Sequence, residues 1–91
     1  YDIALEELSG VLPAGTAEEA LDAKELGRAI NQFLDTLDPL GRRLFVRRYW
    51  YMDSISTLAL TLGMTPGAVR TRLARLRSQL KEELESKGVY V

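Results

Sequence analysis

The sequence predicts an all-α domain of four helices, the last two of which form a helix-turn-helix. Apolar residues recur at helical spacing through most of the chain, and no stretch alternates as a strand does. Gly63 stands between two such apolar stripes, where a left-handed residue can end a helix at little steric cost. With 91 residues and a 46% hydrophobic content, the chain can form one small domain with a compact core.

The chain divides into an acidic linker over residues 1–15 and a helical domain over residues 16–91. Leucines near the start have helical spacing, but Ser9-Gly10 interrupts them and Pro13 ends them (Leu5, Leu8 and Leu12). We therefore expect no more than one or two helical turns before residue 16.

The first two helices of the domain are predicted from their caps. Thr16 and Glu19 have the spacing of a capping box, and the helix they begin is expected to run to about Leu37. Asp38 and Pro39 then supply an N-cap and a first helical residue for a helix that runs to about Tyr51.

The helix-turn-helix occupies the rest of the domain. Ser54 caps a short helix whose apolar stripe ends before the turn (Ile55, Leu58, Ala59 and Leu62). Thr65 and Pro66 begin the last helix, which is expected to run to about Lys87 and to stop at Gly88. Helices joined by so short a turn cross steeply, which leaves the second one projecting outward.

Acidic and basic residues are segregated along the chain. Residues 1–40 hold nine acidic residues against two basic ones, whereas residues 41–81 hold nine basic residues against Asp53 alone. The formal net charge of −1 hides this separation. A basic segment that includes an exposed helix is typical of a domain that binds nucleic acid.

The last helix has three distinguishable faces. Stepping about 100 degrees per residue from Val69 gathers a buried stripe on one side (Val69, Leu73, Leu76 and Leu80). The opposite side carries small residues and one arginine (Thr71, Ala74, Arg75 and Ser78). Arg70 and Arg77 flank the stripe on one side and Arg72 on the other.

These faces suit a helix lying in the major groove of duplex DNA. Small side chains permit close approach, and Arg75 can reach a guanine edge. The flanking arginines are placed for phosphates, and the helix N-terminus at Thr65 can also take a phosphate. Arg48, in the second helix, is a further candidate for phosphate contact.

The same residues are compatible with other interpretations. Arginines on an exposed helix can simply be a solvated face, although no acid interrupts them before Glu82. The aromatic run at residues 49–51 could stack on bases, but Tyr49 in the core and Trp50 at a helix edge fit the pattern better. Arg47 and Arg48 could be helix C-terminal charges favoured by the dipole.

The composition argues against several function classes. The chain has no histidine and no cysteine, which excludes imidazole and thiolate metal sites and Cys/His catalysis. We expect no cofactor, no small-molecule substrate and no enzymatic activity. No apolar run approaches the roughly 18 residues of a membrane span, and no signal peptide opens the chain. Because the sequence begins at Tyr1, we expect it to be a piece of a longer protein.

Read together, these motifs resemble region four of bacterial RNA polymerase sigma factors, most closely the extracytoplasmic-function group. The resemblance covers about residues 20–85. It rests on the Asp38-Pro39 opening, the Arg48-Tyr49 pair, the Ser54-capped helix, the Leu62-Gly63 turn, and the Gly-Ala-Val-Arg-Thr-Arg-Leu run at residues 67–73.

The resemblance implies that the domain binds the minus thirty-five promoter element while docked on the flap of the polymerase beta subunit, in the bacterial cytoplasm at the nucleoid. An anti-sigma factor is a further implied partner. By position, four residues would face bases or nearby phosphates (Arg70, Thr71, Ala74 and Arg75). Arg72 would touch the DNA backbone, and Arg48 would hold a phosphate.

The chain departs from the family pattern at three positions. Asp38 replaces a leucine, Thr57 stands where a glutamate is usual, and Ala68 replaces a threonine or serine. The last change removes a hydrogen bond and leaves the DNA sequence open. Two alternatives also stay open: the output domain of another transcription regulator, and an interaction module that never touches DNA.

Overall fold

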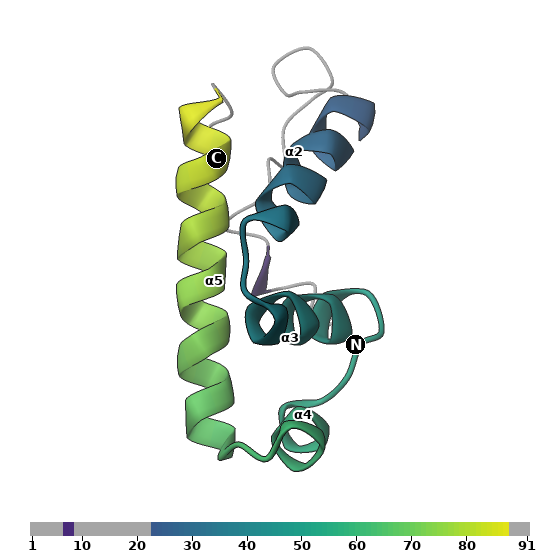
Figure 1. Ribbon diagram of the computed structural model, residues 1–91, viewed down its shortest axis with the longest axis vertical. Coiled ribbons are helices and arrows are strands. Elements are labelled where there is room, and N and C mark those ends of the chain that lie inside the picture. The colour runs from purple at the N-terminus through teal and green to yellow at the C-terminus, as the bar shows by residue number, and fades with distance from the viewer. Residues whose placement is uncertain (1–6, 9–22, 88–91) are drawn as a thin grey trace.

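The computed structural model describes residues 7–8 and 23–87, and this part of the chain contains four helices and no strand. In chain order they are α2 (Ala23–Asp35), α3 (Pro39–Tyr49), α4 (Ile55–Leu62) and α5 (Pro66–Ser86). The prediction of an all-α domain with a C-terminal helix-turn-helix is confirmed (Figure 1).

Three of the helices begin at the predicted N-cap residues. Asp38 accepts a hydrogen bond from the Gly41 N–H at 3.1 Å, which satisfies one backbone donor of the first turn of α3. Ser54 does the same for α4 and Thr65 for α5, each at 3.1 Å. Pro39 and Pro66 occupy first-turn positions, where their missing N–H breaks no helical bond.

The turn between α4 and α5 depends on Gly63. Its φ of 65° and ψ of 37° place it in the left-handed region, which only glycine enters without a steric cost. The Met64 N–H then donates to the Ala59 carbonyl at 2.9 Å, which closes the end of α4. The sequence prediction of this glycine-centred turn is confirmed.

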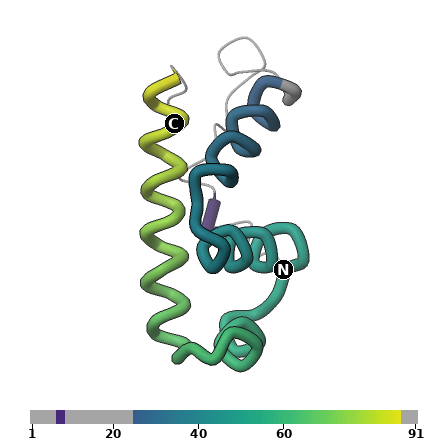
Figure 2. Tube along the Cα trace, in the orientation of Figure 1, coloured from purple at the N-terminus to yellow at the C-terminus, as the bar shows by residue number. Residues whose placement is uncertain are grey.

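Helix α5 is the element to which the other three attach. It runs along the length of the molecule, and α2, α3 and α4 lie against successive parts of it (Figures 1 and 2). Helix α3 also contacts α4. One long helix therefore supplies both an interior face for packing and an opposite face directed away from the rest of the domain.

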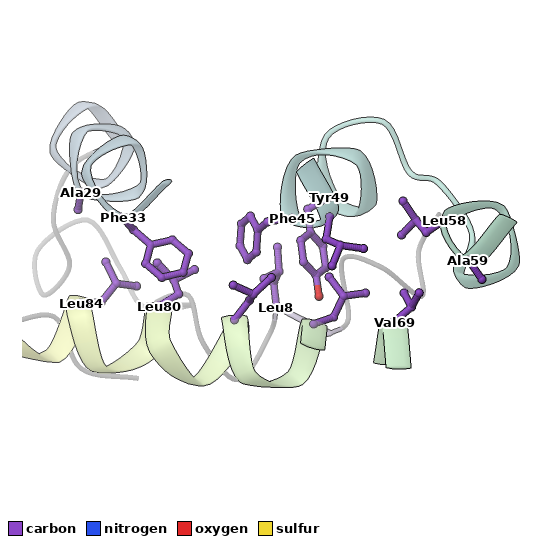
Figure 3. Packing of buried hydrophobic residues seen from close by; sticks show 13 residues of the cluster. Leu8, Ala29, Phe33, Phe45, Tyr49, Leu58, Ala59, Val69, Leu80 and Leu84 are labelled. Carbon is purple, nitrogen blue, oxygen red and sulfur yellow. The ribbon is translucent and has the colours of Figure 1, made fainter. Parts of the chain in front are cut away.

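The core follows the buried side of α5. Five residues of this helix have 2% exposure or less, namely the four predicted ones and Leu84, which extends the stripe by one turn (Val69, Leu73, Leu76, Leu80 and Leu84). Phe45 packs edge-on to Phe33, with ring centroids 5.6 Å apart, and lies 4.8 Å from the Tyr49 ring (Figure 3). The expectation that Tyr49 lies in the core is confirmed, and Trp50 is 54% exposed at the end of α3.

Helix boundaries differ from the predictions at a few places. Helix α3 ends at Tyr49 rather than near Tyr51, because the chain reverses through Met52, whose φ of 58° is incompatible with a continuing helix. The capping box at residues 16–19 and the stop at Gly88 lie outside the described residues.

Within the expected linker, Glu7 and Leu8 are described, and Leu8 is only 8% exposed in the core. The sequence did not predict that Leu8 contacts the core, because a single leucine beside Ser9-Gly10 does not indicate which residues it packs against. For the rest of residues 1–15, which lie outside the described part, the linker remains a prediction.

Gly41 is tightly enclosed and offers a test of the α3 cap. A Cβ added there would lie 2.7 Å from the Asp38 carboxylate oxygen, so the cap must shift. Because loss of the N-cap offsets the gain in helix propensity, we expect Gly41→Ala to be less stable than the Gly27→Ala variant by about 1 kcal/mol, the typical value of an N-cap. Gly27→Ala in α2 is the matched control, because nothing lies within 4 Å of its added Cβ. Helix propensity predicts that this control raises stability by about 0.5–1 kcal/mol. Urea denaturation measures both, and equal shifts would contradict this account.

Candidate nucleic-acid interface

The outward face of α5 is composed as the sequence predicted. Thr71, Ala74, Arg75 and Ser78 are all exposed, whereas Val69 on the opposite side is fully buried. The orientation of the helix is thus confirmed. The exposed residues line a shallow open hollow that Gln79 and Glu82 extend toward the C-terminus.

Arg70 and Arg75 are the two arginines of α5 whose guanidinium groups remain accessible to a binding partner. Both are exposed, and among the described residues neither forms an ion pair. Arg75 projects from the outward face beside Ala74, whose small side chain leaves the guanidinium accessible. A guanidinium that is not neutralised can offer two parallel donors to an acceptor pair such as a guanine edge.

Arg72 is engaged by the start of α3. Its Nη2 donates to Asp38 Oδ1 at 2.7 Å, on the same carboxylate that caps α3. The hydrogen bond from Arg72 lowers the pKa of Asp38, and the Gly41 N–H adds to this. Arg72 therefore links α5 to α3, on the flank where the sequence placed it as a phosphate contact.

Arg48 and Arg77 lie together around one carboxylate, that of Glu7. Arg48 Nη2 contacts Glu7 Oε2 at 2.8 Å, and Arg77 Nη1 contacts Glu7 Oε1 at 3.3 Å. The Tyr49 hydroxyl also donates to Oε1, at 2.8 Å, and accepts from Arg77 Nη1 at 3.0 Å. We call this group, formed by Arg48, Tyr49, Arg77 and Glu7, the Glu7 cluster.

The Glu7 cluster contains two of the predicted phosphate contacts, Arg48 and Arg77. Arg48 is only 6% exposed, and its Nη1 donates to the Asp53 carbonyl at 2.8 Å, which ties the α3–α4 loop to α3. Arg77 is half-buried, with a side chain 25% exposed. Neither arginine is presented to solvent as the predicted phosphate contact requires, because Glu7 already occupies their donors.

Sequence reasoning missed Glu7. Helix α3, which carries Arg48, contains no acidic residue, and Glu7 supplies the balancing charge from 41 residues upstream. The one available signal was Leu8, an apolar residue directly beside an acid in a segment expected to be a linker. Thr65 is exposed, and its hydroxyl oxygen accepts from the Ala68 N–H, which confirms it as the predicted N-cap of α5.

The ionisable groups of the cluster are shifted in opposite directions. Burial works to raise the pKa of Glu7, but the hydrogen bonds from Arg48 and Tyr49 and the nearby positive charges outweigh it, so the pKa lies below its ordinary value. Burial raises the pKa of Tyr49 from 10.0 to about 12, and the hydrogen bond to Glu7 adds to the rise. At neutral pH Glu7 is therefore ionised and Tyr49 is protonated, as the hydrogen bonds of the cluster require.

The Tyr49 shift predicts an alkaline loss of stability. Because its pKa is raised in the folded state, the contribution to stability is complete below pH 10.0 and is lost as the pH rises through about 12. We expect the unfolding free energy of the wild type to fall across this interval more steeply than that of Tyr49→Phe. Tyr51→Phe, which removes a tyrosine that is 62% exposed, is the control and should follow the wild type. Denaturant titrations at a series of pH values measure this, and parallel wild-type and Tyr49→Phe curves would contradict it.

Two other kinds of site receive no support from the described part of the chain. No group of histidine, cysteine, aspartate or glutamate residues there could hold a metal ion. None of the four helices is both long enough and apolar enough to cross a membrane.

The fold and the exposed basic face of α5 define this chain as a helix-turn-helix domain. Comparison with known proteins places it more closely. It is 32% identical over 78 residues to the RNA polymerase sigma-E factor of Streptomyces avermitilis, a match that covers 86% of this chain and 44% of the relative. The sigma-E factors of Streptomyces antibioticus and Streptomyces coelicolor are each 30% identical over 78 residues, covering 86% of this chain and 43% and 44% of the relatives.

The resemblance to RNA polymerase sigma factors is therefore confirmed, because three curated sigma-E factors match most of this chain at about 30% identity. The chain spans less than half the length of the curated relatives it matches. No family model matches the chain, and no solved structure matches it.

Proposed function

We propose that this domain binds promoter DNA, at the minus thirty-five element, as part of a sigma factor that directs transcription initiation by RNA polymerase. The observation that carries the proposal is the outward face of α5, the helix that follows the Gly63 turn. On this face Arg75 is exposed among small side chains and forms no ion pair with any described residue. The names of the similar proteins support the link to RNA polymerase. A role of this kind is not enzymatic and belongs to the bacterial cytoplasm and nucleoid.

In this proposal α5 lies in the major groove. Arg75 reads a guanine edge, while Thr71 and Ala74 allow the helix to approach closely. Arg70 contacts a phosphate on one groove wall, and the α5 N-terminus near Thr65 faces another. Arg72 lies on the opposite flank, where it can reach the DNA backbone only if its bond to Asp38 is shared or exchanged.

We also propose that the exposed side of α3 is the surface that binds the flap of the polymerase beta subunit. An apolar depression there is lined by Leu37, Pro39 and Val46 and bordered by three arginines (Arg42, Arg43 and Arg47). An apolar floor with a charged border is the usual composition of a protein–protein contact. The depression lies on α3 rather than on the outward face of α5, so the two proposed surfaces allow the domain to bind polymerase and DNA at the same time. An anti-sigma factor would compete for one of these surfaces.

Selection from a pool of random duplexes tests DNA binding directly. We expect the 91-residue chain to enrich a common sequence, and to bind it by fluorescence anisotropy at least tenfold more tightly than a scrambled duplex. The logarithm of the binding constant should fall linearly with the logarithm of salt between about 0.05 and 0.2 M, as phosphate contacts require. Recovery of no common sequence would contradict the proposal.

Mobility shifts with and without polymerase distinguish the two alternatives. An interaction module would shift promoter fragments only when polymerase is present, and Arg75→Ala would leave that shift unchanged. A regulator of another class would bind its selected duplex but would not bind the isolated flap. We expect binding to both, with the flap interaction weakened by Val46→Asp and not by Arg75→Ala.

A further inference from the structure

We propose that Arg48, Tyr49 and Arg77 form an anion site that takes a DNA phosphate, and that Glu7 occupies this site from within the chain until DNA displaces it. The inference rests on the proposed DNA-binding function and adds a way in which the N-terminal segment regulates it. Glu7 and Leu8 together are called the clasp.

The donors of this site converge as they would on a phosphate. Two guanidinium groups and one hydroxyl direct four hydrogen bonds at the two oxygens of the Glu7 carboxylate, at 2.8 to 3.4 Å. Arg48 is held in place by its separate bond to the Asp53 carbonyl, so its position does not depend on Glu7 alone. Removing Glu7 leaves two positive charges side by side, because no other described carboxylate contacts either arginine.

The site lies on the side of α5 that faces one wall of the proposed groove. Arg70 and Arg77 are seven residues apart, so they share one flank of the helix and are separated by about 10 Å along its axis. Backbone charges recur at about 3.4 Å along each DNA strand. A strand that passes Arg70 therefore brings later phosphates toward Arg77.

The clasp is attached to the rest of the domain through one apolar side chain and one carboxylate. Its apolar contact is the side chain of Leu8, which lies among Ile30, Phe45 and Leu80 beside a small crevice. The Glu7 side chain is 24% exposed, so solvent and counterions already reach one edge of the cluster. A duplex with many phosphates can compete with one carboxylate held in this way.

Three variants of the 91-residue chain separate release of the clasp from a change in net charge. Glu7→Gln removes the carboxylate charge, and Leu8→Ala releases the clasp without changing the charge. Asp35→Asn is the matched charge control, because its carboxylate is 81% exposed on α2 and its ion-pair partner is Arg42, which does not belong to the cluster. Circular dichroism confirms that each variant is folded at the temperature of the titration.

We expect Glu7→Gln and Leu8→Ala each to bind the selected duplex about fivefold more tightly at about 0.05 M salt, and to steepen the salt slope by about 0.9, the value for one added phosphate. Asp35→Asn should stay within twofold of the wild type. Arg77→Ala should weaken binding in the Glu7→Gln background more than in the wild type.

The opposite results overturn the inference without touching the proposed function. If the wild type binds and Arg75→Ala weakens it, but neither clasp variant differs from Asp35→Asn, the clasp does not regulate DNA binding. The assignment of Arg77 to the anion site would also be contradicted if Glu7→Gln steepened the salt dependence of binding and the added Arg77→Ala change did not reverse it. If no variant binds any selected duplex, the proposed function itself has failed.

Discussion

Leu73→Ala is expected to lower the unfolding free energy by about 2–5 kcal/mol, the range for a buried leucine truncated in a packed core. Leu73 is 1% exposed and lies at the centre of the α5 stripe, where α3 and α4 both pack against the helix. The lost methyl groups leave a cavity that three helices would have to close together. Small domains have only about 5–15 kcal/mol of stability in total, so this variant should be partly unfolded at moderate temperature.

The measurement is urea denaturation followed by circular dichroism. Leu60→Ala is the matched control, because Leu60 is 86% exposed on α4 and its truncation should change stability by no more than about 0.5 kcal/mol. An unfolding midpoint of Leu73→Ala equal to that of Leu60→Ala would show that the interior face of α5 has been assigned to the wrong side.

Arg75→Ala is expected to weaken binding of the selected duplex by about 1–3 kcal/mol, and to do so at one base position. A panel of duplexes with single base changes measures this, since the variant should lose its preference at that position and retain the others. Arg70→Ala is the matched control: it removes an equally exposed arginine from a flank of the same helix.

The control should weaken all sequences alike and make the salt slope shallower by about 0.9, because a phosphate contact carries no sequence information. If the Arg75→Ala profile runs parallel to that of the wild type across the panel, Arg75 does not read a base. The outward face of α5 would then have to bind DNA by another residue.

Local signals in the sequence predicted most of the fold. Asp38, Ser54 and Thr65 cap their helices as expected, and Gly63 ends α4 in the left-handed conformation. Such features depend on residues three or four positions apart, so their geometry follows from backbone hydrogen bonding alone. The interior and exterior faces of α5 were predictable for the same reason, because a straight helix fixes the angle between its residues.

The ion pairs between residues far apart in the sequence could not be predicted in the same way. Arg48 and Glu7 are 41 positions apart, and Arg72 and Asp38 are 34 apart. Whether an arginine faces solvent or a carboxylate depends on which helices meet, and spacing within one helix does not contain that information. Position alone therefore suggested phosphate contacts for three arginines that the structure finds bound to carboxylates (Arg48, Arg72 and Arg77).

These pairs give the charge separation of the sequence a structural meaning. Glu7 and Asp38 both come from the acidic part of the chain, and both neutralise arginines of the basic part. Among the arginines of α5, only Arg70 and Arg75, in its N-terminal half, form no ion pair with a described residue. A small number of free arginines beside small side chains favours selective contact over general attraction to DNA.

A double-mutant cycle between Arg75 and a guanine tests the central claim most directly. Each guanine of the selected duplex is replaced in turn by 7-deazaguanine, which lacks the N7 acceptor of the major groove, and the affinities of the wild type and Arg75→Ala are measured. Our account predicts one guanine at which the replacement weakens the wild type by about 1–3 kcal/mol and leaves Arg75→Ala unchanged. If every replacement affects the two proteins equally, the outward face of α5 does not lie in the major groove with Arg75 on a guanine edge.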